Sequence, residues 1–160
     1  MSADLTFLLP EGVFSVRAGA VIVHGERLLV MRDERSPYYY LPGGRLHLHE
    51  TAEQAVLREV REELGIEAKI ARPLWLCQNF FTEDVSHEKY HELCFYFLMD
   101  ISQTDLLSRG ESFSGAERRH RQRFCWLPFE SLADAYLYPL FIKERIFDLP
   151  QQLELLTEIK

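Results

Sequence analysis

Three glutamates near the middle of the chain stand at a spacing that suits metal chemistry. Glu59, Glu62 and Glu63 would lie within one turn of each other on one face of a helix, which turns about 100° per residue. Like charges at this spacing repel each other, and Glu62 and Glu63 fall in the last turn, where the helix dipole favours cations. Carboxylate oxygens are ligands that Mg²⁺ and Mn²⁺ prefer, so the cluster is a candidate metal site. Taken alone, the same pattern also fits a solvated acidic face.

The residues around these glutamates predict the helix that would carry them. Thr51 and Gln54 have the spacing of a capping box, and Gly65 stands where a helix would end. Apolar residues between these ends fall on one arc of about 100° and would form the buried face: Val56, Leu57, Val60 and Leu64. Arg58 precedes Glu62 by four residues and can neutralise one of the acids.

The rest of the chain alternates between apolar runs and turn-forming residues. We expect strands over residues 13–24, 27–32, 38–41, 66–81, 90–101 and 123–127. Pro42, Gly43 and Gly44 would close the third strand, and short helices would begin at Pro128 and Pro139. Residues 82–89 read as a loop and residues 102–122 as a flexible excursion. Because strands outnumber helices and the order is mixed, we predict an α/β sandwich with a mixed sheet.

Composition narrows the class of protein. A chain of 160 residues with 47% apolar residues suits one domain with a substantial core. The net charge of −7 disfavours DNA and anionic membranes as general partners. The first residues carry an acid where a signal peptide would carry Lys or Arg, and Cys77, Cys94 and Cys125 lie in apolar runs that favour buried reduced thiols. We therefore expect a cytoplasmic protein without a membrane segment.

Residues 44–66 resemble the Nudix box, the pattern G-x5-E-x7-R-E-U-x-E-E-x-G-U in which U is a bulky aliphatic residue. All nine specified positions are filled, by Gly44, Glu50, Arg58, Glu59, Val60, Glu62, Glu63, Gly65 and Ile66. The preceding residues 41–43 look like the usual lead-in, and residues 126–132 resemble a late family segment before a terminal helix. The chain therefore resembles the MutT-like Nudix pyrophosphohydrolases, which implies one domain over residues 1–160 folded as an α/β/α sandwich.

The resemblance implies a role for each matched residue. The ligands of Mg²⁺ or Mn²⁺ would be the three box glutamates: Glu59, Glu62 and Glu63. Arg58 would orient a glutamate by ion pairing, and Gly44 would let the backbone approach the helix and the metal closely. Glu50 would either brace the loop or contribute to the metal site. Family members are often homodimers, which makes a homodimer an expectation here.

The implied reaction is hydrolysis of a diphosphate linkage in a nucleotide-like small molecule. A divalent ion offsets the charge of the diphosphate and lowers the pKa of a bound water, and a general base takes the proton of the attacking water. In the family the base is a box glutamate or a glutamate elsewhere. Glu92, at the start of the strand expected over residues 90–101, is our candidate for an extra ligand or base. The alternative for Glu92 is an ordinary charge at a strand edge.

Signals for the substrate are weaker. Residues 78–82 contain neither the proline common in family members that act on ADP-ribose nor the tyrosine common in those that act on dinucleoside polyphosphates. Candidate stacking residues for a base are Tyr40, Phe80 and Phe81, which fit the core equally well as large aromatics. Arg32 and Arg45 are candidate phosphate contacts, against a solvated role.

Two other functions stay open from the sequence. One is a non-catalytic module that senses nucleotides, although the complete set of box acids favours an enzyme. The other is an RNA-end pyrophosphohydrolase, in which the basic run over residues 117–123 grips phosphates. The alternative for that run is a solvated loop. His47 and His49 lie two residues apart without cysteines nearby, so a zinc site there is disfavoured.

Overall fold

Two β-sheets form the centre of the protein in the computed structural model, which describes residues 3–160. The larger sheet has the strand order β1-β2-β7-β6-β10, with β5 also paired to β2. Its strands are β1 (Thr6–Leu9), β2 (Gly12–Val21), β5 (Gly43–Arg45), β6 (Lys69–Thr82), β7 (Lys89–Asp100) and β10 (Glu154–Ile159). The smaller sheet has the order β3-β4-β9-β8, with β3 (Val23–His24), β4 (Arg27–Asp33), β8 (Ser112–Ser114) and β9 (Gln122–Pro128).

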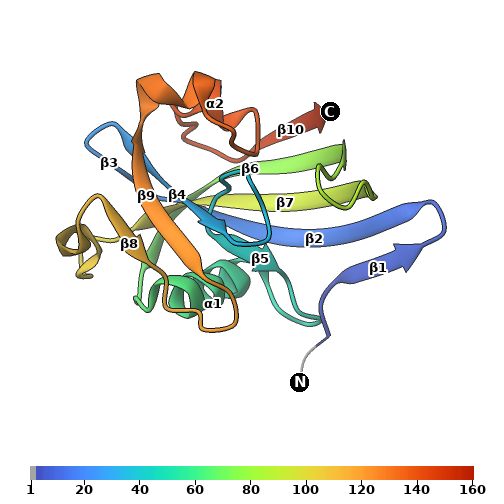
Figure 1. Ribbon diagram of the computed structural model, residues 1–160, viewed down its shortest axis with the longest axis horizontal. Helices are drawn as coiled ribbons and strands as arrows, with labels where there is room; N and C mark the ends of the chain where they lie inside the picture. Colours follow the sequence, from blue (N-terminus) through green and yellow to red (C-terminus); the bar gives the residue numbers. More distant parts are fainter. Residues whose placement is uncertain (1–2) are drawn as a thin grey trace.

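The helices lie on opposite sides of the larger sheet. In the view of Figure 1, helix α1 (Ala52–Leu64) lies below the strands and the short helix α2 (Ile142–Arg145) lies above them. Two 3₁₀ turns, η1 (Leu106–Arg109) and η2 (Phe129–Asp134), complete the secondary structure. The α1 side packs a core that includes Ala20, Val60 and Phe97. The α2 side packs a second core that includes Trp75 and Ile142.

The larger sheet mixes parallel and antiparallel pairs. Strands β2 and β7 are parallel, as are β6 and β10, whereas β6 and β7 form a long antiparallel pair. Strands β1 and β5 both pair antiparallel with β2. This mixture of strand directions, with helices on both faces, confirms the predicted fold class of an α/β sandwich with a mixed sheet.

Most of the predicted elements are present, with four differences. The strand expected over residues 38–41 is wrong, because these residues make only isolated bridges, Met31 to Tyr40 and Tyr39 to Leu137. Gly43 and Gly44, which are expected to end a strand, instead form part of β5. Strands β1 and β10 were missed because most of their residues are exposed and carry no clear pattern of burial. The excursion over residues 102–122 contains η1 and β8, held by buried side chains of Leu106 and Phe113.

The helices of the fold are short compared with the thickness of a bilayer. Within residues 3–160, none of them combines the length and the apolar character that a membrane crossing requires.

Candidate active site

Helix α1 forms where the sequence predicts it. The Thr51 hydroxyl accepts a hydrogen bond from the Gln54 backbone N–H at 3.0 Å, and the Gln54 side chain accepts one from the Thr51 N–H at 3.0 Å. Gly65 ends the helix in the left-handed conformation, with φ at 66°. Ala55, Val60 and Leu64 have no exposed surface and hold the helix against the sheet. The predicted capping box and glycine stop are therefore confirmed.

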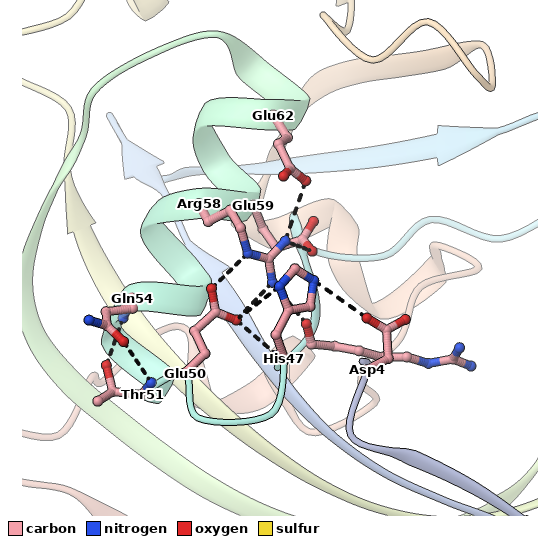
Figure 2. A network of polar contacts seen from close by, with 9 residues as sticks. Asp4, His47, Glu50, Thr51, Gln54, Arg58, Glu59 and Glu62 are labelled. Carbon is pink, nitrogen blue, oxygen red and sulfur yellow. Dashed lines mark hydrogen bonds and ion pairs between the residues drawn. The ribbon is translucent and has the colours of Figure 1, made fainter. Parts of the chain in front are cut away.

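Arg58 connects the helix with the loop before it (Figure 2). Its Nε donates to Glu50 Oε2 at 2.7 Å and its Nη2 donates to Glu50 Oε1 at 3.0 Å. Its Nη1 donates to Glu59 Oε1 at 2.8 Å and, more weakly, to Glu62 Oε2 at 3.4 Å. Glu50 also accepts from the backbone N–H of His47 at 2.9 Å. These contacts occupy both oxygens of Glu50, which favours the loop-bracing alternative for this residue over the metal-ligand one.

The three box glutamates occupy different environments. Burial raises the pKa of Glu63 well above its ordinary value, and the charge of Glu59 raises it further, although the Gly43 N–H donates to its Oε1 at 2.9 Å. Burial also raises the pKa of Glu59, despite the ion pair with Arg58. The Glu62 side chain is 48% exposed. Glu59 and Glu63 are thus held beside each other, with Arg58 offsetting the charge of Glu59 and Arg17 offsetting part of the charge of both.

The glutamates fit a hard divalent cation by their chemistry and by the glycine beside them. A Cβ on Gly44 would lie 2.4 Å from Glu59 Oε1, so only glycine allows β5 to pass this close to the carboxylate. Crowded carboxylates with few neutralising partners attract Mg²⁺ or Mn²⁺. As the side chains stand, no three Asp, Glu, His or Cys residues in the described part of the chain converge to hold an ion. Glu59 and Glu62 are instead turned toward Arg58, as Figure 2 shows.

A cavity of about 300 Å³ lies on the face of the larger sheet that points away from helix α1. Strand β5, which precedes the box helix, contributes Gly43 and Arg45 to its lining. Of the residues that the sequence suggested, Tyr40, Arg45, Phe81 and Glu92 line it. Glu92 is 8% exposed, and burial raises its pKa although Arg17 and Arg45 oppose that shift. The cavity therefore places a buried acid, an arginine and two aromatic rings in one space.

Two suggested substrate contacts lie elsewhere. Phe80 precedes Phe81 in β6, and successive side chains of a strand point to opposite faces. Its ring packs against His91 at a centroid distance of 4.5 Å, outside the cavity. The guanidinium carbon of Arg32 lies 4.8 Å from the centre of the Tyr39 ring, and Arg32 is likewise not among the lining residues. The structure therefore removes Phe80 and Arg32 from the candidate cavity.

The cavity also contains residues that the sequence pattern did not single out. Ser15 and Arg17 of β2 face it, and Asn79 of β6 lies directly opposite Glu92. The signal for the first two was present, because Ser15 and Arg17 alternate with Phe14 and Val16 in an otherwise apolar strand.

A polar network at the far end of the cavity depends on the chain's last residues. Asp84 accepts from the Tyr138 hydroxyl at 2.7 Å and from Lys160 Nζ at 2.9 Å. These contacts, together with one from Tyr136, lower the pKa of Asp84 to about 2. No local pattern in the sequence relates these four residues, because β10 brings Lys160 to the cavity only by pairing with β6.

The fold and the box together define the class of domain. The chain belongs to the NUDIX domain family, whose model matches residues 13–145, and this confirms the resemblance seen in the sequence. It is 26% identical over 106 residues to an ADP-ribose pyrophosphatase of Methanocaldococcus jannaschii, covering 64% of this chain and 60% of that protein. It is 45% identical over 53 residues to a MutT-like protein of Streptomyces ambofaciens, covering 33% of this chain and 34% of that protein.

The solved structures agree on the fold. A MutT protein from Bacillus halodurans superposes with a TM-score of 0.60 at 14% identity, covering 90% of this chain and 89% of that one. At this identity the likeness concerns the fold alone. The chain spans only 60% of the Methanocaldococcus protein and 34% of the Streptomyces protein, so the activities and substrates of these relatives do not transfer directly to it.

Proposed function

We propose that this protein hydrolyses the diphosphate linkage of a nucleoside diphosphate joined to another moiety, with Mg²⁺ or Mn²⁺ as the required ion. The observation that carries the proposal is a direct contact between the box helix and a residue that lines the cavity. Glu63 of α1 accepts a hydrogen bond from Gly43, and Gly43 itself lines the cavity that contains Glu92. The carboxylates for the ion and the space for the substrate therefore meet at β5.

Each residue at this junction has a separate task. Glu59, Glu62 and Glu63 would hold the ion, which when bound neutralises phosphate charge and lowers the pKa of a water molecule. Arg58 orients Glu59 through its 2.8 Å contact, and Gly44 leaves the space that this carboxylate fills. Glu92 would receive the proton of the attacking water, because a carboxyl with a pKa raised by burial is a better base near neutral pH.

The lining of the cavity supports a nucleotide-like substrate. Tyr40 and Phe81 line the cavity and offer aromatic surface for contact with a base, and Phe81 itself stacks on Tyr90 with centroids 5.0 Å apart. Arg45 lines the same cavity and is the candidate contact for a phosphate. The relative named an ADP-ribose pyrophosphatase has a substrate of this class.

The alternatives receive less support. The residues lining the cavity include none from the basic run over 117–123, so the site as described does not favour an RNA-end substrate. A non-catalytic sensor would not need the complete set of box acids that α1 presents beside the cavity.

The proposal is tested by measuring phosphorylated products from nucleoside triphosphates, ADP-ribose, dinucleoside polyphosphates and nucleotide sugars, with and without Mg²⁺ or Mn²⁺. We expect turnover of one class that requires the ion and disappears in Glu62→Gln. The matched control is Glu53→Gln, an exposed acid in the first turn of α1 at a position that the box pattern leaves unspecified. Ion-independent turnover, or full activity in Glu62→Gln, would contradict the proposal. If no substrate is turned over while the ion still binds, the sensor function replaces it.

Two further expectations accompany this proposal. The three unpaired cysteines of the described chain, Cys77, Cys94 and Cys125, support a reducing compartment such as the cytoplasm. A homodimer stays a prediction, and light scattering on the purified protein would test it.

A further inference from the structure

The larger sheet extends past the helix that covers one of its faces. Strands β2, β6 and β7 continue well beyond the end of α1 in the view of Figure 1. On the face that α1 covers, the packed core ends near Val16 and Phe95, which are only partly buried against it. Beyond them, large apolar side chains at both edges of the sheet are exposed, Phe7 to 53% and Ile159 to 79%.

One row of side chains crosses all five strands of this outer part. Strand pairing places each member directly opposite the next, from β1 through β2, β7 and β6 to β10: Phe7, Phe14, His91, Phe80 and Ile159. The ring centroids are 6.4 Å apart from Phe7 to Phe14 and 5.3 Å apart from Phe14 to His91. From His91 to Phe80 they are 4.5 Å apart. The row is therefore one continuous aromatic ridge that ends in an aliphatic side chain.

This ridge lies on the face opposite to the cavity. Successive side chains of a strand point to opposite faces, and the neighbours of the ridge residues along their strands line the cavity: Ser15, Phe81, Tyr90, Glu92, Glu158 and Lys160. The interior side of the sheet is thus used for the cavity, while the ridge faces outward on the side of α1.

The residues beside the ridge are also unusual for a protein surface. We define the open face as the ridge and the two rows next to it on the same face of the sheet: Phe7, Phe14, His91, Phe80, Ile159, Val16, Leu93, Gln78, Thr157, Leu9, Lys89 and Thr82. None of these residues is acidic, although 25 of the 160 residues of the chain are Asp or Glu. Few charges and many aromatic rings are typical of the centre of a protein interface.

The width of the open face indicates what covers it. Neighbouring strands are about 4.8 Å apart, so five strands make a surface about 24 Å wide. A single helix is too narrow, because with its side chains it is only about 10–12 Å across. A second sheet of the same width would cover it completely, since sheets pack face to face at a separation of about 10 Å. The open face of another copy of this chain is such a sheet, equally wide and equally free of acids.

We propose that the open face is the interface of a homodimer, in which the ridges of two copies pack against each other around a twofold axis. Three rows of side chains extend about 20 Å along the strands, so each copy contributes about 500 Å². The pair would bury about 1,000 Å², which is near the lower limit for a specific interface. The dimer should therefore be reversible and form in the micromolar range of protein concentration.

The interface shares a strand with the cavity. Ile159 belongs to the open face, whereas Glu158 and Lys160 on either side of it line the cavity. Strand β10 is an edge strand, paired within the described chain only with β6. A second copy packed on Ile159 would hold in place the strand that brings Lys160 to Asp84. The dimer therefore supports the cavity from the opposite face of the sheet.

Sedimentation velocity at increasing protein concentration tests the interface. We expect the wild type to change from monomer to dimer and Phe7→Glu to stay monomeric, because its carboxylate would be buried against the apolar rows of the second copy. Ile159→Glu should behave in the same way. The matched control is Leu8→Glu, because Leu8 follows Phe7 in β1 and is 79% exposed but points to the opposite face. This variant should dimerise like the wild type.

Thermal unfolding gives a second readout and shows that the variants are folded. The Tm of the wild type and of Leu8→Glu should rise with protein concentration, because only folded chains dimerise. The Tm of Phe7→Glu should not change with concentration. A wild type that is monomeric at every concentration would overturn the proposal and leave the open face to a different protein. Equal effects of Phe7→Glu and Leu8→Glu on the dimer would also overturn it. Neither measurement depends on hydrolysis, so the proposed function is tested separately.

Discussion

Replacing Arg58 by methionine tests whether one arginine organises the box helix. The substitution keeps much of the side-chain volume but removes four hydrogen bonds to Glu50, Glu59 and the Arg45 carbonyl, at 2.7 to 3.0 Å. The side chains of Arg58, Glu50 and Glu59 are only 18%, 14% and 15% exposed. Removing one partner of a buried ion pair costs about 3–5 kcal/mol, and the remaining exposure places this case near the lower end, at about 3 kcal/mol.

Arg61→Met is the matched control on the same helix. Arg61 pairs with Glu67 at 2.6 Å, but the two side chains are 55% and 74% exposed. An exposed pair is worth about 0–1 kcal/mol, so this control should cost much less. For a domain of this size, about 3 kcal/mol corresponds to a fall in Tm of about 6–12 °C, against less than about 4 °C for the control. Both are measured by thermal and urea unfolding in the presence of a chelator.

The pH dependence gives a second readout for Arg58→Met. Hydrogen bonds from Arg58 lower the pKa of Glu50 below its ordinary value of 4.5. A carboxyl whose pKa is lowered on folding contributes stability above its unfolded pKa and loses it as the pH falls through the folded pKa. The difference between wild type and Arg58→Met should therefore be fully present near pH 7 and shrink below about pH 4.5. Equal losses in Arg58→Met and Arg61→Met at neutral pH would refute the reasoning.

Three other predictions concern the site. Glu63→Gln should raise the Tm of the metal-free protein, because it removes a buried charge, and should abolish the further rise in Tm that Mg²⁺ or Mn²⁺ gives the wild type; a retained ion effect would exclude Glu63 as a ligand. Gly44→Ala should cost about 1–3 kcal/mol in urea unfolding, because its Cβ would displace Glu59, and a neutral effect would mean that Glu59 moves freely. Phe81→Leu should raise KM whereas Phe80→Leu should not, and equal effects on KM would remove the cavity as the substrate site.

The sequence predicts the box helix well because its determinants are local. Thr51, Gln54 and Gly65 act within one helical turn of the ends that they define, and the apolar face follows from a period of 3.6 residues. Strands β6 and β7 were also predicted, because each is a long apolar run that needs no partner to be noticed. By contrast, most residues of β1 and β10 are exposed and carry no clear pattern of burial, and β10 is held by pairing with β6, which lies far away in the sequence.

The cavity was harder to predict for the same reason. Arg45 and Arg17 are 28 residues apart in the sequence, and only the register of β5 against β2 places them opposite each other. Lys160 reaches Asp84 only because β10 joins the sheet beside β6. Phe80 and Phe81 are neighbours with the same chemistry, and the choice between them depends on which face of β6 meets the cavity.

Strand β5 explains how a helix on one face of the sheet can act on a ligand bound at the other. Its three residues pair with β2 at the edge of the sheet, and within the described chain no further strand pairs with β5. Gly44 faces the helix and leaves space for Glu59, whereas Gly43 donates its N–H to Glu63 and lines the cavity, and Arg45 turns into the cavity opposite Arg17. Alternation along one short strand thus connects the carboxylates of α1 with the cavity that contains Glu92. This connection is the reason to expect that the ion and the diphosphate of the substrate meet at β5 and not at the centre of either face of the sheet.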